Sequence, residues 1–152
     1  MNPLSTVPNL TQRPPRSSRV RLGGYVILPR ILDKCRAELA GTNGEYHYDC
    51  PLDQNFFRFT GIDPAALKAE VAKGLGDGEI LAWVTANAPI KHTDWEIAQW
   101  SLFRATTVPS DNETREFING EVAKAGGATR EDIGTFFDYL DLDDHVTFGG
   151  KA

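Results

Sequence analysis

The sequence predicts a mainly α protein, an irregular bundle of about seven short helices. Apolar residues recur at helical spacing in several segments, and residues that cap or start helices precede most of these segments. No segment alternates apolar and polar residues as a half-buried strand would, and no repeat of fixed period is present. The connections are short, which favours antiparallel neighbours, and short helices favour an irregular arrangement over a regular four-helix bundle. At most one small hairpin, near residues 44–50, is expected as β structure.

Length and composition indicate one soluble domain. The chain has 152 residues, of which 41% are hydrophobic and 24% charged, both ordinary values for a globular protein. The apolar run Tyr25-Val26-Ile27-Leu28 is too short for a secretory signal or a membrane span, so a cytoplasmic location is predicted. Cys35 and Cys50 are then expected to be free thiols.

The N-terminal segment is predicted to be an extended basic arm over residues 1–22 that packs on a single helical domain, 23–152. Four prolines disfavour a helix before residue 20. Residues 1–30 carry five arginines and no acid, although the whole chain has a formal charge of −5. The arm is expected to pair with the acidic body of its own chain or of a sister subunit. Nucleic acid is disfavoured because a net-acidic domain repels polyanions.

The first helix has an apolar face that repeats every three or four residues, at Leu28, Ile31, Leu32, Cys35 and Leu39. Pro29 suits its first turn and Gly41 its end. Because Cys35 lies on this face, it is predicted to be a small core residue rather than a nucleophile.

Later helices are placed by their start and stop residues. Pro51 and Gly61 are predicted to bound the second helix, and Asp63-Pro64 to open a third that runs to about Lys73. Asp77 is expected to cap a helix that begins near Gly78.

The last three helices are placed by their capping residues. Two capping boxes, Thr93-x-x-Glu96 and Ser110-x-x-Glu113, are expected to open two of them. Thr129 is expected to cap the last helix, whose apolar face is Ile133, Phe136, Phe137 and Leu140. An acidic tail would follow from Asp141.

Residues 44–53 hold an imidazole, two phenols, a thiol and three carboxylates, and are predicted to form an acid/base site. His47 would be the acid or base, with Asp49 or Asp53 orienting it. Tyr46 and Tyr48 would bind the substrate or polarise it. The alternative is a loop with half-buried phenols, in which the histidine caps a helix.

A second candidate is an anion site made by Tyr25, Arg30 and Lys34, with Arg19 or Arg21 beside them. The alternative is that these cations pair internally with the acidic segment at Asp141, Asp143 and Asp144. Trp95 is a candidate substrate-binding aromatic, although the tryptophans at helical spacing could equally belong to the core.

No metal or cofactor is predicted. The spacing His47-x-x-Cys50 is typical of metal ligands but is weak evidence alone. His92 and Glu96 are four residues apart, yet a cap at Thr93 would leave His92 outside the helix. No phosphate-binding loop, nucleotide fingerprint or serine elbow is present.

Nearly the whole chain resembles an uncharacterised bacterial family catalogued as domain of unknown function 5069. The matching segments are Arg13-Pro14-Pro15-Arg16-Ser17, Arg19-Val20-Arg21-Leu22-Gly23-Gly24-Tyr25, Leu28-Pro29-Arg30, Asp33-Lys34, Gly44-Glu45-Tyr46-His47-Tyr48, Cys50-Pro51-Leu52-Asp53, Gly76-Asp77-Gly78-Glu79-Ile80, Trp95-Glu96-Ile97 and Leu142-Asp143-Asp144-His145. The resemblance implies a single full-length domain. It implies no activity, substrate or cofactor.

Two functions remain open from these residues. The first is a small cytosolic, cofactor-free enzyme of the lyase, isomerase or hydrolase type, which acts on a small anionic or partly apolar substrate. The second is a non-catalytic helical module that binds a small molecule or a protein, with a homodimer as one form. Neither function involves nucleic acid or a membrane.

Overall fold

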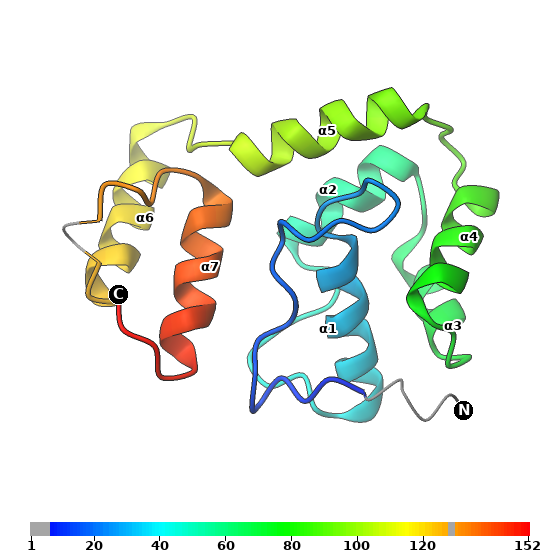
Figure 1. Cartoon of the computed structure of the whole chain (residues 1–152), viewed down its shortest axis with the longest axis horizontal. Coiled ribbons are helices and arrows are strands. Elements are labelled where there is room, and N and C mark those ends of the chain that lie inside the picture. Colours follow the sequence, from blue (N-terminus) through cyan, green and yellow to red (C-terminus); the bar gives the residue numbers. More distant parts are fainter. Residues whose placement is uncertain (1–6, 128–129) are drawn as a thin grey trace.

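The computed structural model describes residues 7–127 and 130–152, and within them the chain is mainly α, as predicted. The helices are α1 (Leu28–Ala40), α2 (Pro51–Thr60), α3 (Pro64–Val71), α4 (Asp77–Asn87), α5 (Asp94–Thr106), α6 (Asn112–Lys124) and α7 (Phe136–Thr147). Helices α1 to α4 form one group and α6 with α7 another, and α5 runs along one edge and connects them (Figure 1). None of these helices is long and apolar enough to cross a membrane.

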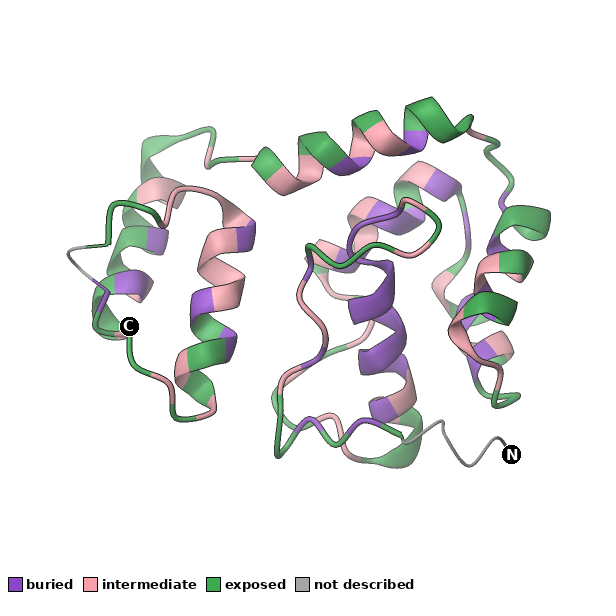
Figure 2. Cartoon of the chain, in the orientation of Figure 1, coloured by how far each residue is buried: buried purple, intermediate pink, exposed green. Residues whose placement is uncertain are grey.

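Helix α1 is the centre of the larger group. Every residue from Leu28 to Cys35 is buried, so the helix has neighbours on all sides along its first two turns (Figure 2). Pro29 lies in the first turn, and Gly41 ends the helix in the left-handed conformation, both as predicted. Cys35 is fully buried in the main core, where burial raises the pKa of its thiol to about 12. This matches the prediction of a core residue.

The small hairpin that the sequence allows near residues 44–50 does not form. This segment consists of turns, and the isolated bridge between Leu22 and Tyr25 is the only β pairing in the described part of the chain. Gly44 and Asp49 both have positive φ angles, 54° and 59°, which bend the chain twice within six residues. An extended segment would need neither bend.

Two predicted helix caps are wrong. Helix α4 begins at Asp77 itself, after Gly76, because the Asp77 carboxylate binds two arginines instead of capping. Helix α6 is capped by Asp111, whose carboxylate accepts from the amide of Thr114 at 2.7 Å. A carboxylate suits a helix N-terminus better than the hydroxyl of Ser110 because it also complements the helix dipole.

The last helix begins later than predicted. Thr135 and Asp138 form a reciprocal capping box that opens α7 at Phe136, so Ile133 precedes the helix. The predicted cap, Thr129, lies outside the described residues. Because α7 runs to Thr147, the acidic segment from Asp141 is helical rather than a tail.

The described part of the arm, residues 7–22, runs beside α1 and contacts two other elements (Figure 1). Arg16 pairs with Asp33 of α1 and with Asp77 of α4. Arg19 pairs with Asp138 and Asp141 of α7. The arginine-rich start of the chain therefore pairs with the acidic body of the same chain.

Candidate functional site

The first turn of α2 and the residues just before it direct polar groups inward, onto α1. The Lys34 ammonium and the Asp53 carboxylate form an ion pair at 2.7 Å, and both side chains are almost fully buried. Lys34 also donates to the Cys50 sulfur at 3.2 Å, and the second Asp53 oxygen accepts from the Asp49 amide at 2.9 Å. Burial raises the pKa of Asp53, and the charge of Lys34 partly offsets this rise.

A second buried pair lies one turn earlier on α1. The Arg30 guanidinium donates two hydrogen bonds, at 2.7 and 3.2 Å, to the Asp144 carboxylate of α7. The Tyr46 hydroxyl donates to the same carboxylate at 2.8 Å. Burial and this hydrogen bond raise the pKa of the Tyr46 phenol. Arg30 therefore pairs internally with the acidic segment, while Lys34 pairs with Asp53.

The remaining predicted catalytic residues are not brought together. His47 is exposed, and its ring makes no hydrogen bond or ion pair within the described residues. The Asp49 carboxylate accepts from the Gln54 amide. The Tyr48 hydroxyl donates to the Pro64 carbonyl oxygen at 2.7 Å, and burial raises the pKa of this phenol. Asp53 is the one predicted catalytic carboxylate inside the buried cluster.

Two predicted substrate-binding aromatics lie elsewhere. Tyr25 is buried edge-on against Phe56, with ring centroids 5.3 Å apart, and belongs to the main core. Trp95 is 70% exposed on α5. Within the described residues, neither side chain makes a hydrogen bond or an ion pair with Lys34 or Asp53.

His92 lies outside α5, as predicted, but it contacts Glu96, which was not expected. It precedes α5, as the Thr93 cap predicts, yet its Nδ1 lies 2.9 Å from a carboxylate oxygen of Glu96. Its Nε2 lies 2.6 Å from the carbonyl oxygen of Phe59, so both ring nitrogens have partners. Across the described ranges, no three histidine, cysteine, aspartate or glutamate residues are grouped as a metal site requires.

The His47→Ala variant is expected to change the free energy of unfolding by less than about 0.5 kcal/mol, because the exposed side chain has no hydrogen-bond or ion-pair partner among the described residues. Urea denaturation of both proteins would measure this. A loss above about 1 kcal/mol would contradict the observed placement of His47, because it would mean that the imidazole contributes to the stability of the fold.

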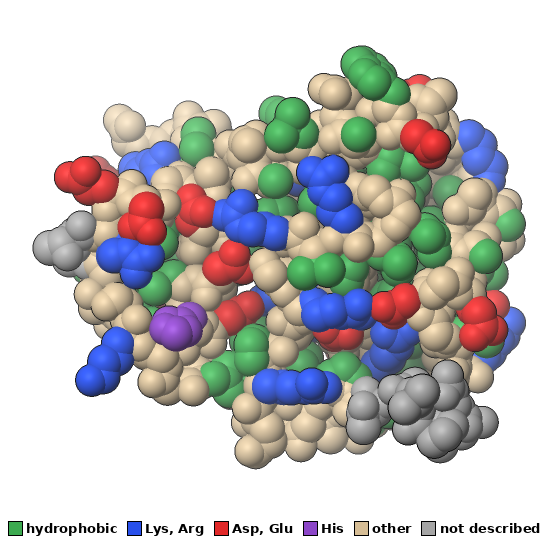
Figure 3. All heavy atoms as spheres, viewed as in Figure 1, with side chains coloured by type: hydrophobic (Ala, Val, Ile, Leu, Met, Phe, Trp, Pro, Cys, Tyr) green, Lys and Arg blue, Asp and Glu red, His purple; other side chains and the backbone are tan. Residues whose placement is uncertain are grey.

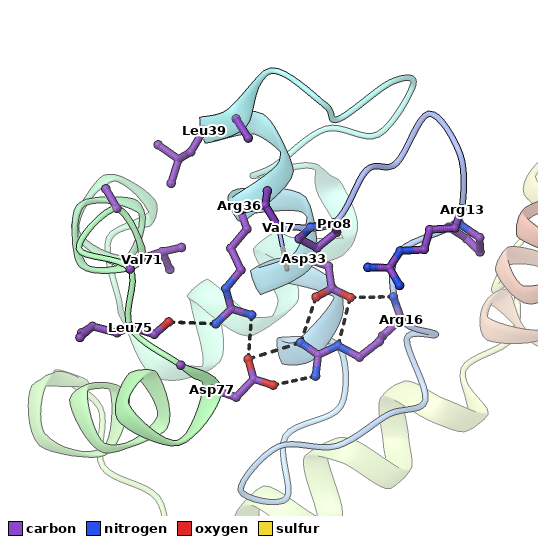
Figure 4. Close-up of a pocket in the computed structure, with 15 residues that line it drawn as sticks. Val7, Pro8, Arg13, Arg16, Asp33, Arg36, Leu39, Val71, Leu75 and Asp77 are labelled. Atoms are coloured by element: carbon purple, nitrogen blue, oxygen red, sulfur yellow. Dashed lines mark hydrogen bonds and ion pairs between the residues drawn. The ribbon is translucent and has the colours of Figure 1, made fainter. Parts of the chain in front are cut away.

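A cavity of about 760 Å³ lies between the arm, the C-terminal half of α1 and the loop before α4 (Figure 4). Its charged lining consists of three arginines and two aspartates: Arg13, Arg16, Arg36, Asp33 and Asp77. Its apolar lining includes Val7, Pro8, Pro14, Leu39, Val71 and Leu75. The cavity thus combines one excess positive charge with an apolar wall.

The guanidinium of Arg16 is held rigidly in this cavity. It donates to both oxygens of Asp33, at 3.0 Å each, and to Asp77 at 2.7 Å (Figure 4). Arg36 donates to the same Asp77 carboxylate at 2.8 Å and to the carbonyl oxygen of Leu75 at 3.2 Å. Burial tends to raise the pKa of Asp77, but the bonds from Arg16 and Arg36 outweigh it and lower that pKa. These bonds fix the positions of both arginines.

Arg13 is different, because its side chain points toward this cluster without an ion-pair partner in the described part of the chain (Figure 4). Sequence reasoning missed Arg13 and Arg36 as site residues. A signal for Arg36 was present, since Asp33 and Arg36 are three residues apart and share a helix face. No sequence pattern marks Arg13 in the same way, because its place in the cavity wall depends on how the arm folds back onto α1.

A family model described as "Domain of unknown function (DUF5069)" matches residues 12–146, which is most of the chain. No curated protein matches the sequence.

Proposed function

The chain belongs to the DUF5069 family, and we propose that it binds a small molecule with an anionic group and an apolar body in the cavity beside Arg13. One observation carries the proposal: the Arg13 guanidinium lines a cavity of about 760 Å³ and has no ion-pair partner in the ranges described. Pockets of this size are typical of small-molecule sites.

Preorganised charge supports an anionic ligand. Asp33 and Asp77 fix Arg16 and Arg36, so neither arginine would lose much side-chain freedom when a ligand binds. The two terminal nitrogens of Arg36 donate to Asp77 and to the carbonyl oxygen of Leu75, which leaves its Nε–H available. Guanidinium groups of this kind recognise a carboxylate or a phosphate.

The apolar wall supports a ligand with a hydrophobic part. Leu39, Val71 and Leu75 line the side of the cavity away from the arm (Figure 4). A free inorganic ion would leave this wall in contact with water, whereas an aliphatic or aromatic group would cover it. The ligand class is therefore an organic acid or a phosphate monoester of modest size.

Binding has more support than acid/base catalysis at His47. The catalytic hypothesis needs a carboxylate that orients the imidazole, and His47 is exposed without such a partner in the described chain. We also propose that the protein acts in the cytoplasm, where its two free cysteines, Cys35 and Cys50, would stay reduced.

The Arg13→Ala variant is expected to bind the ligand about tenfold more weakly, because a charge-assisted hydrogen bond contributes about 1.5 kcal/mol when water still reaches it. The experiment is a thermal-shift screen of wild-type protein against aliphatic and aromatic carboxylates and phosphate monoesters, followed by titration calorimetry. A compound at a hundred times its dissociation constant adds about 2.7 kcal/mol of stability.

Arg21→Ala is the matched control. It removes the same charge from the same arm, but Arg21 is exposed and does not line the cavity. Equal weakening by both variants would mean that only overall charge matters, and a screen with no binder would reject the proposal. Separate carboxylate and phosphate series show which anion the arginines prefer.

A further inference from the structure

The chain contains the dipeptide Asn-Gly twice, at Asn43-Gly44 and at Asn119-Gly120, each time followed by a glutamate. In this dipeptide the backbone nitrogen of the glycine can attack the side-chain carbonyl carbon of the asparagine. Glycine favours the reaction because no Cβ shields its nitrogen. Asparagine is accordingly among the thermolabile residues of proteins. Whether either pair reacts in the folded protein depends on the backbone around it.

Asn43-Gly44 lies in a turn between α1 and α2. Gly44 is exposed and has a positive φ of 54°. Its backbone amide donates to no acceptor within the described residues, so the nitrogen is free to attack. The lower edge of the molecule, where residues 41–46 lie beside the arm in Figure 1, is mostly uncharged surface (Figure 3). One hydrogen bond restrains the Asn43 side chain, from its amide to the carbonyl oxygen of Tyr46 at 2.8 Å, and brief local opening of the turn releases it.

Asn119-Gly120 is the same dipeptide inside a helix. Both residues are exposed, and a Cβ on Gly120 would meet no atom within 4 Å, so crowding does not protect them. They lie in the interior of α6, where the amide of Gly120 is expected to donate to the carbonyl oxygen of Glu116, one turn earlier. The helix would have to unwind locally before that nitrogen could reach the Asn119 side chain. The helical backbone, rather than low exposure, therefore protects Asn119.

We propose that Asn43 is a site of spontaneous deamidation, a one-way covalent change that needs only water. The Gly44 nitrogen forms a bond to the Asn43 Cγ, the Cγ–Nδ2 bond breaks, and the proton of the Gly44 amide leaves with Nδ2 as ammonia. The resulting succinimide ring adds one water molecule, which opens either of its two C–N bonds. One opening gives aspartate at position 43. The other gives isoaspartate, in which the main chain runs through the side-chain Cγ.

The modified turn would hold the arm less firmly. The Leu10 amide donates to the carbonyl oxygen of Thr42, next to Asn43, at 2.8 Å, and a Cβ on Gly44 would lie 3.0 Å from the Leu10 carbonyl oxygen. Isoaspartate adds one atom to the main chain at this close contact. Both products also replace the Nδ2 donor of Asn43 by a carboxylate oxygen, which repels the carbonyl oxygen of Tyr46. The hydrogen bond between Leu10 and Thr42 is therefore expected to weaken.

Loosening of the arm would extend to the cavity beside Arg13. Val7 and Pro8, which come just before Leu10 in the chain, line that cavity. A ligand would then bind the deamidated protein more weakly. This effect on binding rests on the proposed function, whereas the loosening of the arm does not.

Mass spectrometry of the full chain, incubated for days at mildly alkaline pH and then digested, tests the site. We expect the peptide with Asn43 to change from amide to carboxylic acid at least about tenfold faster than the peptide with Asn119, because α6 must first open. In urea, where α6 is unfolded, the two peptides should react at similar rates. Asn43→Gln should abolish the change, because the longer side chain would have to close a larger ring. Equal rates in the folded protein, or no change at Asn43, would overturn the proposal.

Hydrogen exchange tests the consequence for the arm. The Leu10 amide is expected to exchange about fivefold faster in deamidated than in fresh protein, which is the factor that loss of one ordinary hydrogen bond gives. Asn43→Asp should show a smaller increase, because it introduces the carboxylate without the longer main chain. Asn119→Asp is the matched control, with the same change of charge on α6 and no expected effect on the arm. Unchanged exchange at Leu10 in the deamidated protein would reject the loosening of the arm. Neither experiment uses a ligand, so failure here is separable from failure of the proposed binding function.

Discussion

The Asp53→Ala variant is expected to lose about 3–5 kcal/mol of stability, because it leaves the Lys34 ammonium buried without its counter-ion. Lys34 cannot reach water from its place on α1, where its side chain is 3% exposed. The Cys50 sulfur, 3.2 Å away, is a weak acceptor and does not replace a carboxylate. A loss of this size is a large share of the 5–15 kcal/mol typical of a whole domain. Denaturation in urea at neutral pH would measure it.

Lys68→Ala is the matched comparison. Lys68 pairs with Glu38 at 2.6 Å, a shorter distance than in the buried pair, but about a third of each side chain is exposed. An exposed pair is worth about 0–1 kcal/mol after solvent screening. If both variants lost the same stability, burial would not be what makes the Lys34–Asp53 pair important.

The double variant Lys34→Met with Asp53→Leu separates two costs. Replacing both charges by apolar side chains removes the unpaired ion, so much of the loss should be recovered. Recovery should be incomplete, because the Asp49 amide loses its acceptor, the second oxygen of Asp53. Asp49 has a left-handed φ of 59°, and this hydrogen bond helps to hold it there.

The parts of the fold that depend on local sequence were predictable. Helices α1 and α2 begin and end where proline and glycine place them, since Pro29, Gly41, Pro51 and Gly61 act through their own backbone preferences. Such residues need no tertiary partner to exert their effect. The same holds for the Thr93 cap of α5.

The errors occur where a distant residue competes for a side chain. Asp77 is a good cap in isolation, but two arginines that are 61 and 41 positions earlier bind its carboxylate instead. A sequence contains no measure of that competition. The candidate site was hard to predict for the same reason, because the position of Arg13 at the cavity depends on how the arm folds.

The charged residues of α1 explain why the site differs from expectation. Arg30, Asp33, Lys34 and Arg36 each bind a partner from another segment: α7, the arm, α2 and α4 respectively. Arg30 and Lys34, which the sequence predicts to bind an anion, therefore hold the fold together. The arginine without such a partner in the described chain, Arg13, becomes the better candidate for ligand binding.

The Asp144→Ala variant is expected to lose about 3–5 kcal/mol, because Arg30 cannot deprotonate and would remain charged in a buried position. The Tyr46 hydroxyl would lose its acceptor at the same time. Since Asp144 is on α7 and Arg30 on α1, hydrogen exchange should accelerate most in α7.

Asp143→Ala is the matched control, one residue away, exposed and without an ion pair in the described chain. Partial desolvation and the neighbouring Asp144 charge raise the pKa of Asp143 and so disfavour its charged form, which means that its removal should cost nothing or stabilise slightly. Equal losses for both variants would show that α7 depends on its total acidity rather than on the single contact with Arg30.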